Sequence, residues 1–115
     1  MKEIKHRSFE RLIHIRHAIR DIDVFIDGVD EYTFIKDPLI SSAVLFQFSV
    51  IGEAVNHVDE ELLRKYNYPW YKVRGFRNFI SHAYFQIKLE AVWEVIINDL
   101  PELKMMIDMI LQQEQ

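Results

Sequence analysis

The chain has 115 residues, half of them hydrophobic, and a formal net charge of −4 at pH 7. This length is typical of a single domain, and this share of hydrophobic residues excludes an intrinsically disordered chain. The absence of cysteine excludes disulfides and thiolate metal sites. The amino terminus lacks the hydrophobic core of a signal peptide, and no apolar run approaches the roughly 20 residues of a membrane span. We therefore expect a soluble cytoplasmic protein with one domain over residues 1–115 and no contact with a membrane.

The first half of the chain predicts two long helices joined by a short one. Apolar residues at a spacing of three and four indicate an amphipathic helix over about residues 8–26, and Gly28 can form its C-terminal cap. A short helix or turn is expected near residues 31–36. Asp37 is typical of an N-cap, and the following proline suits the first position of a helix that runs through residue 55.

The second half predicts further helices with short connections. Asp59 restarts a short helix, and Pro69 marks the beginning of the next, which carries the region around Arg77. Another helix is expected over about residues 88–98, and Pro101 begins the last one. Only three glycines and three prolines punctuate the chain, which favours helices over many short strands. The predicted fold class is all-α, a bundle of four or five helices with antiparallel neighbours.

The charge is distributed unevenly along the chain. Residues 63–89 contain six Lys or Arg and no Asp or Glu, so this segment is +6 and the remainder is −10, which together give −4. A basic segment in an acidic protein can bind a phosphodiester locally. The alternative is a solvated helix face in which the gap in acidic residues has arisen by chance.

The chemistry-bearing residues are concentrated within this basic segment. Cleavage of RNA needs an acid or base for the 2′-hydroxyl or the leaving oxygen, and a cation beside the developing negative charge. His82 has the right chemistry for the first role and Arg77 for the second. Asn78 could hydrogen-bond a phosphate oxygen or orient His82, and Arg74 and Lys72 are candidates for binding RNA phosphates. We expect no cofactor and no metal site, because this chemistry requires neither.

Helix geometry leaves the site open to two interpretations. Arg77 and His82 are five residues apart, so an ideal helix separates them by about 140° around its axis. A joint site requires either a break in the helix near Ser81 or a second copy of the chain. Alternatively, His82 caps a helix C-terminus, Asn78 is a local cap and Tyr84 is a core aromatic residue.

Other polar residues carry weaker signals. His14 and His17 lie three residues apart, but no third ligand has a convincing spacing, so solvent-exposed or capping histidines are favoured over a metal pair. His57, near a helix end, is interpreted as a cap. Glu53 lies in an apolar run, so it is either a hydrogen-bond partner inside the bundle or a residue facing the active cleft.

Residues 77–84, which read Arg-Asn-Phe-Ile-Ser-His-Ala-Tyr, match the Arg-x4-His-x-Tyr motif of HepT-like toxins. These toxins belong to the HEPN superfamily of helical ribonucleases, which are often metal-independent. The resemblance extends to about Pro101. It includes Ile51-Gly52-Glu53-Ala54, Pro69-Trp70, Gly75-Phe76, Val92-Trp93 and Asp99-Leu100-Pro101.

The resemblance implies a HEPN up-and-down four-helix bundle with an additional short helix, acting as an RNA endonuclease toxin. It implies a homodimer with two motifs facing each other across a cleft. In such a dimer Arg77 and His82 are catalytic and Asn78 supports them. It also implies an MntA-type nucleotidyltransferase antitoxin, which can silence the toxin by transferring AMP to the motif tyrosine, here Tyr84. The added negative charge beside His82 would repel an RNA phosphate.

Two other functions remain as alternatives. A non-catalytic HEPN module could dock a nucleotidyltransferase or a nucleotide, because one fold serves several functions. A purely structural helical bundle is the third possibility. The intact Arg77, His82 and Tyr84 favour the ribonuclease.

Overall fold

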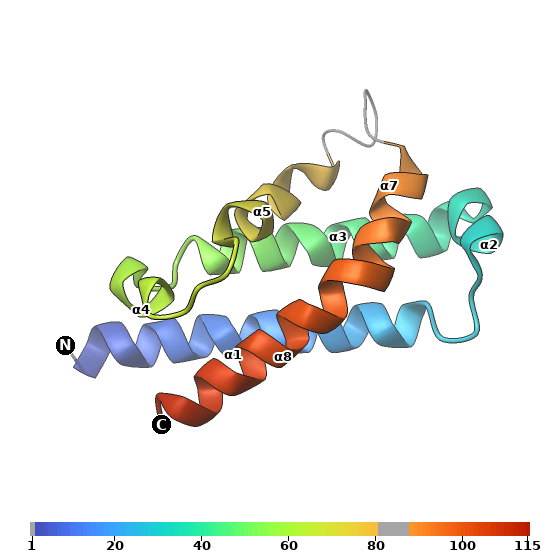
Figure 1. Ribbon diagram of the computed structural model, residues 1–115. Helices are drawn as coiled ribbons and strands as arrows, with labels where there is room; N and C mark the ends of the chain where they lie inside the picture. Colours follow the sequence, from blue (N-terminus) through green and yellow to red (C-terminus); the bar gives the residue numbers. More distant parts are fainter. Residues whose placement is uncertain (1, 81–87) are drawn as a thin grey trace.

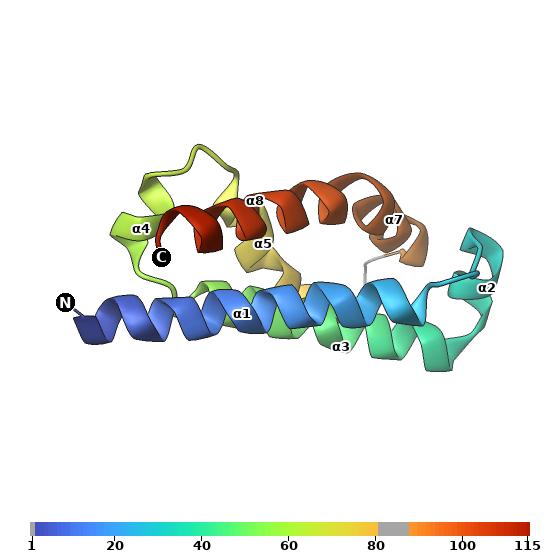
Figure 2. The ribbon, with the colours of Figure 1, turned by 90° about the horizontal axis from the view of Figure 1, so that it is seen from below.

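The structure is a computed structural model that describes residues 2–80 and 88–115. Within these residues every regular element is a helix. Figures 1 and 2 show two layers. Helices α1 (Lys2–Phe25) and α3 (Pro38–Val55) lie side by side in one layer, and α5 (Trp70–Gly75), α7 (Leu89–Glu94) and α8 (Leu100–Gln113) form the other. The prediction of an all-α helical bundle is confirmed.

The connection between α1 and α3 follows the predicted capping signals. Gly28 ends the first helix with a φ of +73°, a conformation that glycine adopts at little cost. The short helix α2 (Glu31–Lys36) comes next. Asp37 caps α3, since its carboxylate accepts a hydrogen bond of 3.0 Å from the Leu39 N–H, and the helix begins with proline as expected.

Helix α1 begins earlier than predicted, at Lys2 rather than near residue 8. The early turns carry mostly charged residues with good helix propensity, so apolar spacing does not reveal them. His6 and Glu10 lie one turn apart on the exposed face, with Nε2 and Oε1 at 3.3 Å. The periodic apolar residues that predicted the helix mark only the part that contacts the core.

Helix α3 is the central helix of the core. Its buried face includes Val44, Phe48 and Ile51, which pack with buried residues of α1 and α8 in one hydrophobic cluster. The helix is long and apolar enough, by length and composition alone, to cross a membrane, which the sequence prediction had excluded. Eight of its residues are buried within the bundle. It therefore has the character of the core helix of a soluble globule.

The segment after α3 is tied down by a tryptophan. Helix α4 (Glu60–Arg64) is short, and Asp59 precedes it as predicted. The indole N–H of Trp70, the first residue of α5, donates to the carbonyl of Leu63 at 3.0 Å. A 3₁₀ turn, η1 (Phe76–Asn78), follows α5 directly. This arrangement brings the start of the motif segment against α3.

Pro101 lies in the first turn of the last helix, α8 (Leu100–Gln113), as predicted, but no loop separates this helix from the one before it. Helix α7 passes through a π-helical turn, η2 (Val95–Asp99), into α8 without a break. Proline has no N–H to donate, and its ring crowds the carbonyl four residues earlier. The wider π turn accommodates the proline: the Leu100 N–H donates to the Val95 carbonyl, five residues back.

Candidate active site

The backbone of Arg77 lies directly against helix α3 at Gly52. A Cβ atom added to Gly52 would lie 2.9 Å from the Cα of Arg77 and 2.9 Å from its Cβ. Real Cβ atoms do not approach other atoms this closely. Glycine at position 52 is therefore what allows η1 to lie on α3, and it fixes where the motif begins.

An aromatic cluster holds η1 in the same place. Phe48 lies one helical turn before Gly52 on α3 and is fully buried. Its ring centroid is 5.0 Å from that of Phe76 and 5.1 Å from that of Phe79, the residues on either side of Arg77 and Asn78. Aromatic pairs at such distances stabilise packing beyond the area they bury. Because Phe76 and Phe79 turn inward, Arg77 and Asn78 are left exposed.

The motif begins in a 3₁₀ turn rather than in an ideal α-helix. Phe76 to Asn78 form this turn, and residues 79 and 80 are again helical. A 3₁₀ turn has about three residues per turn, so the angular spacing of side chains differs from that of an α-helix. The predicted break near Ser81, and the predicted catalytic and regulatory residues His82 and Tyr84, lie outside the described residues.

Three of the six basic residues in the segment 63–89 form ion pairs, and two of the three share one carboxylate, that of Glu60. Lys65 Nζ lies 3.2 Å from Glu114, and Arg64 lies 3.9 Å from Glu60. Arg74, a predicted phosphate ligand, is paired with Glu60 as well.

Lys72 and Arg77 differ from these three residues. Both are exposed, and no carboxylate among the described side chains lies within 4.0 Å of either. Among the described side chains, Arg77 and Lys72 are therefore free of a carboxylate that would compete with a bound anion, whereas Arg74 is engaged by Glu60.

Glu53 lies on the surface, so its interpretation as a partner inside the bundle is wrong. Its side chain is 60% exposed, and Oε1 lies 3.1 Å from Nε2 of His57, four residues further on and just beyond the end of α3. The helical phase explains this position: Gly52 faces η1, so the next residue points away from it. The ring of His57 thus pairs with Glu53, where the sequence had indicated a helix cap.

The histidines at positions 14 and 17 of α1 have the solvent exposure that was expected of them. His14 and His17 are exposed. In the described part of the chain, no group of three His, Asp or Glu side chains is placed to hold a metal ion.

The sequence contains one indication of the contact between Gly52 and Arg77, which is the position of Gly52 inside an apolar helix. A glycine within an otherwise apolar helix lowers helix stability, and its presence there usually reflects a close approach of another backbone. That signal indicates a contact at Gly52. It does not indicate which segment makes the contact.

Residues 15–110 match the family model of the ribonuclease HepT-like family. The chain belongs to this family. The matched range includes α3 and η1, so it contains both sides of the contact between Gly52 and Arg77. The resemblance noted in the sequence is thereby confirmed, and so is the expected enzyme class, ribonuclease.

Several curated proteins are similar to this HepT-like chain over most of its length. "Putative RNase TTE0752" from Caldanaerobacter subterraneus subsp. tengcongensis is 30% identical over 106 residues, which cover 89% of this chain and 95% of that protein. "Putative RNase MJ0127" from Methanocaldococcus jannaschii is 34% identical over 91 residues, covering 78% and 75%. "Probable ribonuclease HepT" from Thermococcus cleftensis is 28% identical over 102 residues, covering 88% and 93%. No solved structure matches the chain significantly.

Proposed function

We propose that this HepT-like protein is a metal-independent RNA endonuclease that acts in the cytoplasm as the toxin of a type II or type VII toxin–antitoxin pair. The observation that carries the proposal is the placement of Arg77. Its backbone is fixed on α3 by Gly52, while its side chain is exposed and has no described carboxylate partner. A rigidly held, solvent-facing arginine suits the binding of a phosphodiester in a protein of a ribonuclease family.

In the proposed reaction the 2′-oxygen of a ribose attacks the adjacent phosphorus, and the bond from phosphorus to the 5′-oxygen breaks. His82 takes the proton from the 2′-hydroxyl or gives one to the leaving 5′-oxygen. The guanidinium of Arg77 stabilises the negative charge that develops on the phosphate, and Asn78 supports the arrangement. Lys72, and Arg74 when it leaves Glu60, bind neighbouring phosphates of the RNA.

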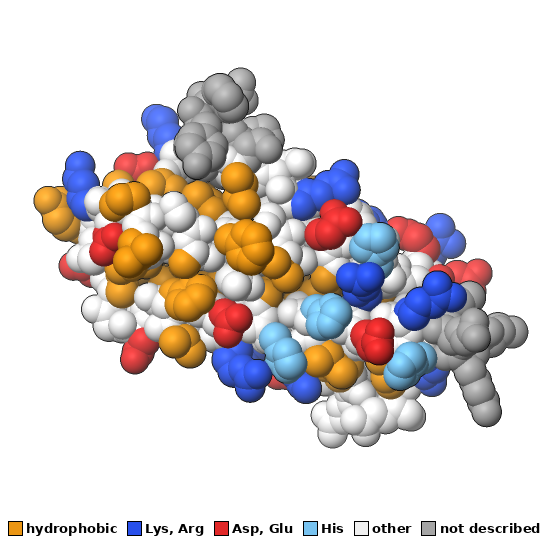
Figure 3. Space-filling view, turned by 180° about the vertical axis from the view of Figure 1, so that it is seen from behind, with side chains coloured by type: hydrophobic (Ala, Val, Ile, Leu, Met, Phe, Trp, Pro, Cys, Tyr) orange, Lys and Arg blue, Asp and Glu red, His pale blue; other side chains and the backbone are white. Residues whose placement is uncertain are grey.

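The proposed active form is a homodimer. Helix α3 exposes large apolar side chains on its outer face, where Leu39 is 80% and Phe46 is 57% exposed. Figure 3 shows hydrophobic side chains gathered on part of the face of the molecule that α1 and α3 form together. Burying such a patch against a second copy would remove it from water. Light scattering that gives the mass of one chain at every concentration would contradict the dimer.

The proposed partner is an MntA-type nucleotidyltransferase antitoxin that transfers AMP from ATP to the hydroxyl oxygen of Tyr84, with release of pyrophosphate. This part of the proposal is supported by the resemblance of the motif around Tyr84. The added phosphodiester carries one negative charge, which disfavours an RNA phosphate at the same site. The transfer would therefore silence the toxin without unfolding it.

The direct test incubates purified protein with total RNA in the presence of a chelator. The wild type should cleave. Arg77→Ala and His82→Ala should each reduce the rate by about a hundredfold, the range expected for the loss of a charge-stabilising group or of an acid–base group. Arg20→Ala serves as the matched control, because Arg20 is an exposed arginine on α1 outside the site.

The outcomes separate the candidate functions. Folded Arg77→Ala and His82→Ala proteins that cleave as fast as the wild type would refute the catalytic assignment. A wild type that does not cleave RNA but forms a stable complex with a nucleotidyltransferase would identify a non-catalytic binding module.

A further inference from the structure

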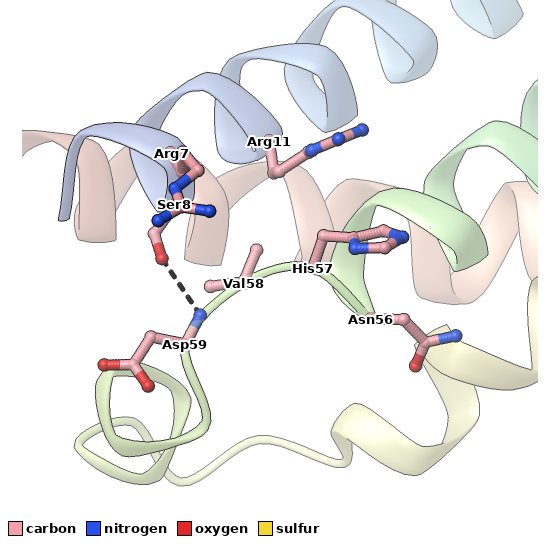
Figure 4. Close-up of a pocket in the computed structure, with 7 residues that line it drawn as sticks. All are labelled: Arg7, Ser8, Arg11, Asn56, His57, Val58 and Asp59. Carbon is pink, nitrogen blue, oxygen red and sulfur yellow. Dashed lines mark hydrogen bonds between the residues drawn. The ribbon is translucent and has the colours of Figure 1, made fainter. Parts of the chain in front are cut away.

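A basic hollow of about 310 Å³ lies between the amino-terminal half of α1 and the loop that follows α3. Arg7, Ser8 and Arg11 line it from α1, and residues 56–59 line it from the loop, as Figure 4 shows. The volume is at the small end of the range for ligand pockets and is sufficient for a phosphate group with part of a nucleoside.

The two walls of the hollow are fastened together. The Ser8 hydroxyl oxygen accepts a hydrogen bond of 2.9 Å from the backbone N–H of Asp59, across 51 residues of sequence. Ser8 is only 1% exposed, and Val58 is buried beside it in the hydrophobic core. Since the loop cannot separate from α1 without breaking this bond and exposing Val58, the shape of the hollow is largely preformed.

The groups that face the hollow favour an anion. Arg7 and Arg11 are one helical turn apart on α1, and no carboxylate among the described side chains lies within 4.0 Å of either. Asn56 adds an amide that can donate hydrogen bonds.

The two carboxylates close to the hollow, those of Glu53 and Asp59, form no ion pair with Arg7 or Arg11. Glu53 is held by His57, with 3.1 Å between Oε1 and Nε2. Figure 4 shows the Asp59 carboxylate directed away from Arg11 and His57.

The hollow lies close to the start of the motif segment. Asn56, the C-cap of α3, has a helical backbone and follows Gly52 by four residues, so it lies about one helical turn, or about 6 Å along the axis, beyond Gly52. Gly52 is in contact with the backbone of Arg77. The hollow therefore begins about one helical turn from the point where Arg77 is fixed.

We propose that Arg7, Arg11 and Asn56 form a second phosphate subsite, which holds a backbone phosphate of single-stranded RNA away from the scissile bond. The proposal rests on the proposed function, because it assumes that RNA is what reaches Arg77. Flexible single-stranded RNA can follow a surface from one positive site to the next. The subsite contributes affinity and register, and the reaction itself takes place at the motif.

The test measures binding of a fluorescent 2′-O-methyl RNA oligonucleotide, which lacks the 2′-hydroxyl nucleophile, as a function of salt. The variant Arg7→Gln/Arg11→Gln removes two charges and keeps polar side chains of intermediate length. The matched control is Arg16→Gln/Arg20→Gln, which removes the same charge from exposed positions of α1 outside the hollow. Thermal unfolding verifies that each variant is folded.

Each phosphate contact on a single strand contributes about 0.7 to the slope of log affinity against log salt. The loss of two contacts therefore lowers the slope by about 1.4. Raising the salt fourfold should weaken wild-type binding about sevenfold more than it weakens binding by the hollow variant. The control variant should keep the wild-type slope.

Each result decides the proposal independently of catalysis. A lower slope in the hollow variant alone supports the subsite even if the wild type cleaves no RNA, which would refute only the proposed function. Equal slopes in the two variants, or no binding of the oligonucleotide by the wild type, overturn the subsite even if the wild type cleaves RNA. Binding of inorganic phosphate or AMP that depends on Arg7 and Arg11, with an unchanged RNA slope, identifies a site for free phosphate compounds and overturns the assignment to RNA.

Discussion

Replacing Gly52 by alanine tests the contact that fixes the motif segment on α3. In an open helix interior, alanine stabilises by about 1 kcal/mol relative to glycine. Here the new methyl group would lie 2.9 Å from the Cα of Arg77, and the backbone must move to accommodate it. Overpacking of this kind costs about 1–3 kcal/mol, and the helix-propensity gain of about 1 kcal/mol offsets part of that cost. We therefore expect Gly52→Ala to be less stable than the wild type by up to about 2 kcal/mol.

Gly75→Ala is the matched control. Gly75 lies at the end of α5, and a Cβ added there meets no atom within 4 Å. This variant should be as stable as the wild type or more stable, by up to about 1 kcal/mol. Thermal unfolding followed by circular dichroism separates the two, since 1 kcal/mol shifts the melting temperature of a chain of this size by about 4 °C.

The same pair of variants reports on the site. Gly52→Ala displaces the backbone of Arg77, so RNA cleavage should fall by much more than the loss of folded protein explains. Gly75→Ala should cleave as the wild type does. A Gly52→Ala protein that is stabilised as much as Gly75→Ala would show that Arg77 does not lie against α3, and the reasoning would fail.

Three further predictions concern stability and regulation. Burial and a hydrogen bond of 2.8 Å to Glu114 raise the pKa of Tyr66 to about 12 from an ordinary value of 10.0. The stabilisation that the protonated Tyr66 hydroxyl contributes is therefore complete below pH 10 and is lost as the pH rises through 12. Urea unfolding should show a shallower alkaline loss of stability in Tyr66→Phe than in the wild type. Asp37→Ala removes the N-cap of α3 and should lower the free energy of unfolding by about 1 kcal/mol, whereas Asp37→Ser should restore most of it. Under the proposed function, Tyr84→Phe should still cleave RNA but gain no AMP in intact-mass spectra after co-expression with the nucleotidyltransferase; a wild type that is neutralised without gaining mass would indicate inhibition by complex formation alone.

The helices and their ends follow largely from the sequence. Gly28 has the positive φ that its place after the first helix predicted, and Asp37 caps α3. Such features depend on residues within one or two turns, whose propensities and side-chain hydrogen bonds act locally. The π turn before Pro101 could not be predicted in this way. A proline is compatible with the start of a new helix and also with a distortion of an existing one, and the local sequence does not distinguish the two.

The candidate site depended much more on tertiary structure. Arg77 and Lys72 could be singled out by residue type, but the ion pair that engages Arg74 forms with Glu60, fourteen residues away on another helix. The direction of the Glu53 side chain depended on which face of α3 packs against η1, and Gly52 lies on that face. The hollow at Arg7 and Arg11 depends on a hydrogen bond between residues 51 positions apart. Local sequence determines which helices form and which residue types they carry. Which charged side chains remain available to a ligand is decided only when the helices pack, because that packing places carboxylates beside some cations and leaves others exposed.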